Sequence, residues 1–350
     1  MATTMKYCCA LSIAILMVLT AGCVIISNRL DAPKEFEEVP LLMTEDNSEV
    51  TVADTLTIMT WNIGYAGMGK EADFFMDGGT QYRPTSKDLL YKNLDGIASH
   101  LVQANVDIML LQEVAKTSWL TRQTNILDAL QRLLPDYHWT YSDDLRTRWI
   151  PWPLRIRIGN ATATRFLPKG AETRALPLEK HFTLGIFRKQ YRMHIIRIEP
   201  DWVIVNVHLS AFDSAQDSTR EEQLRSVLDF AQAEYGKGNK VLVGGDWNLK
   251  LIETDFPHAT DEEHLFWIRT LPLWARPEGW QWVTDDAVPS VRTAHQPYEV
   301  AENYTLVIDG FLVSPNIELV SVSTDNLHFS FSDHHPVTMV VRSKRNSNEP

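Results

Sequence analysis

Six short polar motifs spread over about 270 of the 350 residues constrain this chain most. They are Thr60-Trp61-Asn62-Ile63-Gly64, Leu111-Gln112-Glu113, Asn206-Val207-His208-Leu209, Gly245-Asp246-Trp247-Asn248, Ile308-Asp309-Gly310 and Ser332-Asp333-His334-His335-Pro336. Five of them follow apolar runs that read as buried strands, at Leu56–Trp61, Asp107–Leu111, Trp202–Val207, Lys240–Gly244 and Thr305–Ile308. Layered α/β folds collect ligands at one edge of a sheet, so the motifs predict a single site.

The side chains of these motifs indicate the chemistry of that site. Carboxylates, amides and two imidazoles suit a hard divalent cation and a phosphate group, and they suit thiol or hydride chemistry poorly. The chain has three cysteines, Cys8, Cys9 and Cys23, all in the N-terminal segment. The rest of the chain therefore contains no disulfide framework and no thiolate metal site.

Strands outnumber helices in the pattern of the remaining chain. Helices are expected from a cap at Thr85-Ser86-Lys87-Asp88 to about Gln103, around residues 126–134, and from a capping box at Ser218–Glu221 to Glu234. Further strands are expected around Ala161–Phe166, Phe182–Arg188, Met193–Ile198, Leu306–Val313, Leu319–Ser323 and Val337–Arg342. Several strands follow one another directly, which predicts an α/β fold of two mixed sheets packed face to face with outer helices. We expect one domain over residues 55–343 and a tail over 344–350.

The N-terminus has the pattern of an export signal. Residues 1–26 contain an apolar stretch, and Leu19-Thr20-Ala21-Gly22-Cys23 resembles a bacterial lipobox with a departure at Thr20. Lipidation at Cys23 is the preferred interpretation, with an uncleaved membrane anchor or a cleaved secretory signal as alternatives. Each places the domain outside the cytoplasm. Residues 27–54 are acidic and aperiodic, which indicates a linker that holds the domain off a membrane.

The net charge of −12 weighs against a protein that grips duplex nucleic acid non-specifically. The densest basic stretch contains Arg146, Arg148, Arg155, Arg157 and Arg165, and a groove formed by it would favour a nuclease.

In their order along the chain, these motifs resemble the endonuclease/exonuclease/phosphatase superfamily, which includes deoxyribonucleases, inositol polyphosphate 5-phosphatases and neutral sphingomyelinases. The similarity covers nearly all of residues 55–342. It implies a four-layered α/β sandwich. It also implies that Glu113 is the main ligand of Mg²⁺, with Mn²⁺ as the alternative, and that Asn62 and Asp333 contribute to the metal region.

The resemblance assigns catalytic roles to five further residues. Asp246 positions or deprotonates the attacking water, and Asn248 binds the scissile phosphate. Asp309 orients His334 and keeps it protonated, because a cationic imidazole stabilises the charge that develops on the phosphate. His208 stabilises the phosphate or the leaving oxygen.

Two weaker substrate contacts are Asn160, in a turn-like segment before a strand, and Arg165. For both, a purely structural role is the competing interpretation. The aromatic loop at residues 149–153 and Trp267, Trp274, Trp280 and Trp282 suit either a membrane or base contact or ordinary hydrophobic cover.

Together these features predict an exported, membrane-tethered, Mg²⁺-dependent phosphoester hydrolase that is a phosphodiesterase and a monomer. Its expected substrate is a lipid headgroup or a small phosphodiester. An extracytoplasmic nuclease is the alternative, disfavoured by the acidic charge. A non-catalytic scaffold with the same fold is an alternative of another class, disfavoured because all eight motif residues are present.

Overall fold

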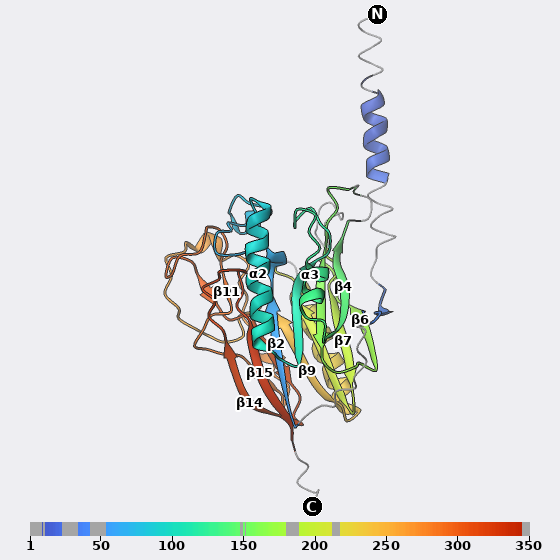
Figure 1. Cartoon of the computed structure of the whole chain (residues 1–350), viewed down its shortest axis with the longest axis vertical. Coiled ribbons are helices and arrows are strands. Elements are labelled where there is room, and N and C mark those ends of the chain that lie inside the picture. Colours follow the sequence, from blue (N-terminus) through green and yellow to red (C-terminus); the bar gives the residue numbers. More distant parts are fainter. Residues whose placement is uncertain are drawn as a thin grey trace, which may run out of the picture.

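The computed structural model describes residues 9, 11–22, 34–42, 54–147, 150, 152–179, 189–211 and 218–344. The expected strand Phe182–Arg188, the basic residue Arg148 and the lipidation site Cys23 lie outside these residues. Residues 11–22 are helical and stand apart from the sheets (Figure 1). Among the described residues, no helix combines the length and the apolar character needed to cross a membrane.

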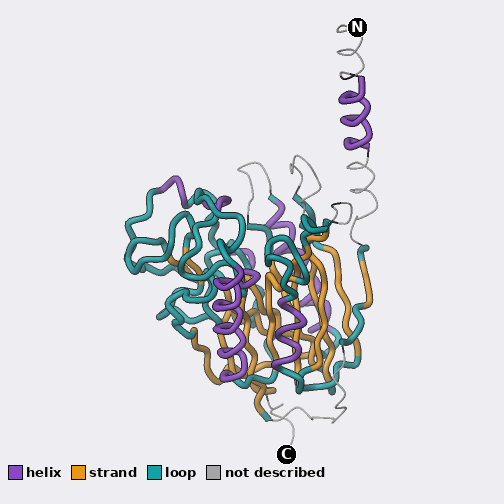
Figure 2. Tube along the Cα trace, turned by 45° about the horizontal axis from the view of Figure 1, so that its top comes forward, coloured by secondary structure: helices purple, strands orange, loops and turns teal. Residues whose placement is uncertain are grey.

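Two large mixed sheets form the domain. The first has the order β1 (Phe36–Glu38), β6 (Gly170–Ala175), β7 (Arg192–Ile198), β8 (Trp202–His208), β9 (Lys240–Asp246), β13 (Asp309–Val313) and β10 (Gln281–Val283). The second has the order β14 (Ile317–Thr324), β15 (Val337–Ser343), β2 (Thr55–Asn62), β3 (Ile108–Ala115), β5 (Arg157–Thr164) and β4 (His138–Arg146). A small sheet pairs β11 (Val291–Arg292) with β12 (Thr305–Leu306). The strands lie at the centre and many loops gather on one side (Figure 2).

The three largest apolar clusters confirm the expected layers. Alternate strand residues such as Ile58, Leu110, Ile204 and Phe311 meet between the two sheets. Helices α2 (Lys87–Ala104) and α3 (Ile126–Leu133) pack on the outer face of the second sheet. Helix α4 (Thr219–Gly236) packs on the outer face of the first. The result is a four-layered sandwich of helix, sheet, sheet and helix.

The interior becomes polar toward one end of the strands. Gln112 Nε2 donates to Asn206 Oδ1 at 2.8 Å, and Asn206 Nδ2 donates to the backbone oxygens of Leu111 and Ala161. These bonds join the sheets where the apolar layer ends. Because buried amides are stable only when paired, the bonds fix how the strands of the two sheets are aligned. That alignment decides which side chains meet at the strand ends.

Two local expectations need correction. Part of the segment expected to be a linker forms β1, which pairs with β6, while Val39 and Leu41 pack against the core. The Ser218 hydroxyl does not cap α4 but donates to Glu222 at 2.8 Å. The Ser86 cap of α2 forms as expected, since its side chain accepts from the Leu89 backbone N–H at 3.0 Å.

Candidate active site

Asp246 lies at the centre of the polar end of the strands, and the strand register places it there. It pairs with His208 across the parallel strands β8 and β9, and with Asp309 across the antiparallel strands β9 and β13. From the other sheet, Asn62 Nδ2 donates to Asp246 Oδ2 at 3.0 Å. All four side chains are buried. Residues separated by as many as 247 positions in the chain, from Asn62 to Asp309, are thus brought together.

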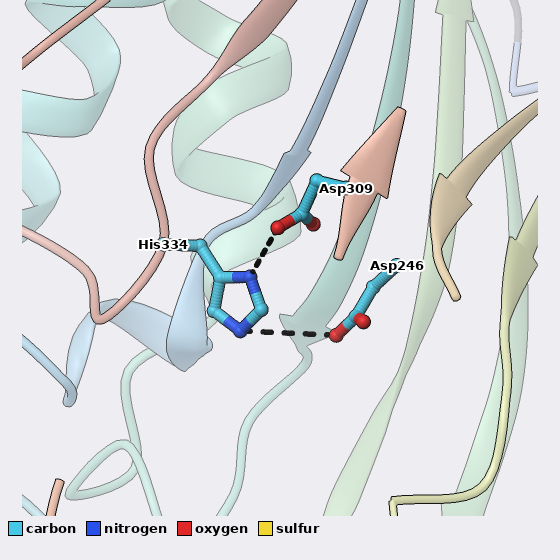
Figure 3. A group of neighbouring side chains, drawn as sticks. All are labelled: Asp246, Asp309 and His334. Carbon is cyan, nitrogen blue, oxygen red and sulfur yellow. Dashed lines mark hydrogen bonds and ion pairs between the residues drawn. The ribbon is translucent and has the colours of Figure 1, made fainter. Parts of the chain in front are cut away.

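His334 lies between two carboxylates. Its Nδ1 is 2.9 Å from Asp309 Oδ2, and its Nε2 is 3.7 Å from Asp246 Oδ2. Figure 3 shows one ring nitrogen turned toward each acid. The backbone oxygen of His334 accepts from the indole of Trp61 at 2.9 Å, which ties this loop to the end of β2.

The two histidines of the site have opposite protonation states at neutral pH. Burial alone would lower the pKa of His334, but Asp309 and Asp246 outweigh it and raise the pKa to about 10. The pKa of His208 is held well below its usual range, first by burial and then by the charges of Lys189 and His334. Burial raises the pKa of Asp246 to about 6 although the charge of His334 opposes this. The site therefore holds an imidazolium, a neutral imidazole and a carboxylate in contact, the pattern of an acid–base centre.

Glu113 reaches the site through a β-bulge. The register of β3 and β5 shifts between Leu111 and Val114, and Glu113 has a φ of 55°. In an unbroken strand Gln112 would face the sheet interface and Glu113 would face the helices. The bulge redirects Glu113, and its Oε1 lies 3.4 Å from Lys189 Nζ on the opposite sheet.

Asp333 approaches the first loop of the site closely. A Cβ at Gly64, whose φ is +47°, would lie 3.1 Å from Asp333 Oδ1, so this approach suits glycine. Burial raises the pKa of Asp333 to about 6, and Glu113 is among the neighbours that raise it. The same two acids raise the pKa of Tyr65, after burial. Glu113 and Asp333 are therefore electrostatic neighbours.

This acidic region fits a divalent cation. Repulsion and burial disfavour two ionised carboxylates, and a bound cation would relieve both. The donors are oxygens, which suit Mg²⁺ or Mn²⁺. Asp246, Asp309 and His334 also offer atoms within 4.8 Å of one another. However, both ring nitrogens of His334 face carboxylates, and a protonated imidazole has no lone pair for a metal.

The expected site residues differ in how the structure uses them. Asn62 Oδ1 accepts from the Gly64 backbone N–H at 3.0 Å, so its amide orients Asp246 and the turn. Asn248, with a φ of 51°, donates its backbone N–H to Asp246 Oδ1 at 3.0 Å and its amide to Leu209 O at 2.9 Å. Asn160 lies opposite the bulge of β3. Its two amide atoms are buried without a hydrogen-bond partner among the described residues.

Arg165 is not part of this site, which corrects the sequence expectation. β5 runs antiparallel to β3, so Arg165 follows the end of β5 that lies beside Ile108, at the start of β3. Its Nε donates to Tyr137 at 3.1 Å, and its guanidinium also contacts Asn105. Arg157 in turn pairs with Asp143 at 2.7 Å. Arg146 is the cross-strand partner of Arg157 at the end of the sheet near Ala115, whereas Arg165 lies at the other end.

Most of the tryptophans that the sequence leaves open are hydrophobic cover. Trp267 is buried, and Trp280 and Trp282 pack against the cluster beneath α4. Trp274 is stacked under Arg225. Among these described residues, Trp152 and Trp274 remain exposed, at 71% and 39%.

The sequence analysis did not identify Ser290, which hydrogen-bonds to Asp309. Its hydroxyl donates to Asp309 Oδ2 at 2.7 Å and accepts the backbone N–H groups of Ile308 and Asp309. Ser290 follows Pro289 in an irregular segment, where no periodicity marks it.

The sandwich fold and this edge cluster define the class of a phosphoesterase or nuclease. The profile of the Endonuclease/Exonuclease/phosphatase family matches residues 59–334. The chain belongs to this family, whose members include metal-dependent phosphodiesterases and nucleases. No curated protein matches the sequence.

Solved structures share the fold at low identity. An endonuclease/exonuclease/phosphatase from Beutenbergia cavernae is 18% identical with a TM-score of 0.53, covering 83% of this chain and 72% of that one. A family protein from Leptotrichia buccalis is 14% identical with a TM-score of 0.52, covering 82% and 99%. D. rerio TDP2 complexed with a single-strand DNA product is 15% identical with a TM-score of 0.50, covering 83% and 100%.

Proposed function

We propose that this chain is an exported, membrane-tethered phosphodiesterase that requires Mg²⁺ and acts on a lipid headgroup or a small phosphodiester. The observation that carries the hydrolase assignment is the placement of His334 between Asp309 and Asp246. An acid–base centre of this kind beside an acidic cation site is what phosphoester hydrolysis requires.

Each residue of the site has its own role in the proposed reaction. Asp246 accepts a proton from water, whose oxygen attacks phosphorus as the bond to the ester oxygen breaks. The imidazolium of His334 and the amide of Asn248 bind the non-bridging oxygens, where negative charge develops. The neutral His208, whose Nε2 is 3.6 Å from Asp246 Oδ2, faces the same centre. Mg²⁺ bound near Glu113 and Asp333 would supply a Lewis acid that offsets phosphate charge.

Asn160 remains a proposed substrate contact. Its buried amide lacks a partner among the described side chains, and leaving such a group unpaired is costly. A phosphate oxygen would accept a hydrogen bond from its Nδ2.

The lipid or small-molecule preference rests on the net charge of −12 and on the apolar N-terminal segment. A nuclease is the second candidate, because the similar TDP2 structure holds a DNA product. A non-catalytic scaffold with the same fold is the third candidate.

A substrate panel distinguishes these candidates. The full-length chain in detergent would be incubated with sphingomyelin and phosphatidylcholine vesicles, with a single-stranded oligonucleotide and with p-nitrophenyl phosphate, each with Mg²⁺ or with EDTA. We expect Mg²⁺-dependent release of phosphorylated headgroup. Faster cleavage of the oligonucleotide would establish the nuclease instead. A folded protein that binds no Mg²⁺ and cleaves nothing would be a scaffold.

A further inference from the structure

Lys189 lies outside all six sequence motifs, yet its positively charged ammonium group reaches the site. It lies three residues before β7, on the first sheet, at the same edge as His208. Its ammonium is 3.4 Å from Oε1 of Glu113 on the second sheet, so this ion pair joins the two sheets. Both side chains are partly exposed, at 26% and 20%, so a ligand has access to them.

The charge of Lys189 acts on two buried side chains of this region, His208 and Asp144. Its charge contributes to lowering the pKa of His208, after burial. It is also the foremost charge that opposes the effect of burial on Asp144, although burial still raises the pKa of Asp144 to about 8. The ion pair of Lys189 is formed with Glu113.

We propose that Lys189 is a substrate-contacting residue whose ammonium leaves Glu113 when a divalent cation binds there and pairs with a phosphate oxygen instead. The proposal rests on the phosphoester hydrolase function above. A divalent cation bound by Glu113 would repel an ammonium that stands 3.4 Å from the same carboxylate. The four-carbon stem of lysine allows its compact charge to move to the next available anion, which is the bound phosphate.

This exchange predicts opposite effects of one substitution. In Lys189→Met a competitor for Glu113 disappears, so metal should bind about fivefold more tightly, as expected from the loss of an ion pair of about 1 kcal/mol. Phosphate should bind about tenfold more weakly in the metal-loaded protein, because a charge-assisted contact is lost. General damage to the site would weaken both.

The test is calorimetry on the full-length chain. Mg²⁺ alone would be titrated first, and then inorganic phosphate at saturating Mg²⁺, into the wild type, Lys189→Met, Lys189→Arg and Lys240→Met. Lys240 is the matched control, since it pairs with Asp201 at 2.6 Å at the opposite end of β9. We expect tighter metal and weaker phosphate only in Lys189→Met, with Lys189→Arg and Lys240→Met close to the wild type.

Other outcomes separate this proposal from the function it rests on. If the wild type binds both ligands and Lys189→Met is unchanged, or weakens both, the role of Lys189 is overturned while the hydrolase function stands. If the wild type binds neither Mg²⁺ nor phosphate, the proposed function is overturned and this proposal with it.

Discussion

The carboxylate of Asp309 accepts a hydrogen bond from Nδ1 of His334 at 2.9 Å, and this contact joins the first residue of β13 to the loop before β15. The contact keeps Nδ1 of the buried imidazole next to a negative charge. It thereby leaves Nε2 as a charged donor directed toward Asp246 Oδ2, 3.7 Å away. The catalytic proposal depends on this arrangement more than on any other.

Replacing Asp309 by Asn should lower the pKa of His334 from about 10 toward its ordinary 6.5, since Asp309 is the foremost charge that raises it. The pKa of the folded protein is the higher value. The stabilisation from the imidazolium is therefore fully present below about pH 6.5 and is lost as pH rises through about 10. Imidazole NMR titration of the metal-free protein measures this directly. An unchanged His334 pKa in Asp309→Asn would refute the proposed coupling.

Asp246→Asn should reduce kcat by about 10²–10⁴-fold, the usual contribution of a general base. The amide keeps the shape of the side chain but cannot accept the proton of water. Circular dichroism and calorimetric Mg²⁺ binding serve as controls, and both should remain near the wild type. Activity within threefold of the wild type would exclude Asp246 as the base.

Glu113→Gln should weaken Mg²⁺ binding by at least about tenfold, an effect of the size seen when groups of a metal site are altered. The bulge that redirects Glu113 is formed by backbone, so the fold should survive the change. Calorimetric titration with Mg²⁺ is the measurement. Equal affinity in Glu113→Gln would move the metal away from this carboxylate.

Gly245→Ala should destabilise the protein by more than about 2 kcal/mol. Both the positive φ of this residue and the close approach of a neighbouring backbone require glycine. Its φ is +154°, and a Cβ would lie 1.9 Å from the Val207 backbone oxygen. Gly170 in β6 has nothing within 4 Å of such a Cβ and is the control, so Gly170→Ala should leave Tm nearly unchanged. Thermal unfolding compares the two variants, and equal Tm values would contradict the close approach of β8 and β9.

Ser290→Ala should cost about 1–3 kcal/mol of stability, because it leaves two buried backbone N–H groups and Asp309 without their hydroxyl partner. Urea unfolding measures the loss, and Ser290→Thr should recover part of it if the pocket accepts the methyl group. A neutral Ser290→Ala would mean that water replaces the hydroxyl without cost.

The sequence predicts the layers and most of the site because strand ends and their order are local features. Asn62, Asp246 and His334 follow or precede strongly apolar runs, so their meeting at one edge follows from the sheet. Asn160 and Arg165 show the limit of this reasoning. They are five residues apart, with Asn160 inside β5 and Arg165 just after it, and only the direction of β5 relative to β3 decides which of them lies near the site.

Other features depend on pairing that a sequence does not display. The bulge at Glu113 is a shift in the pairing of β3 with β5, so it cannot be read from the sequence of β3 alone. β4 was not predicted because polar residues such as Thr140 and Ser142 are buried on its inner face, which hides the alternation. Ser290 and Lys189 stand outside regular strands, where neither periodicity nor motif marks their approach to the site.

Hydrolysis of bis-p-nitrophenyl phosphate by the full-length chain tests the central assignment most directly. It would be followed with Mg²⁺ and with EDTA, for the wild type, Asp246→Ala and His334→Ala. We predict turnover that requires Mg²⁺ and falls at least about 100-fold in each variant, with little further loss in the double variant because the two residues act as a unit. Turnover that resists EDTA, or that persists in either variant, would contradict this assignment.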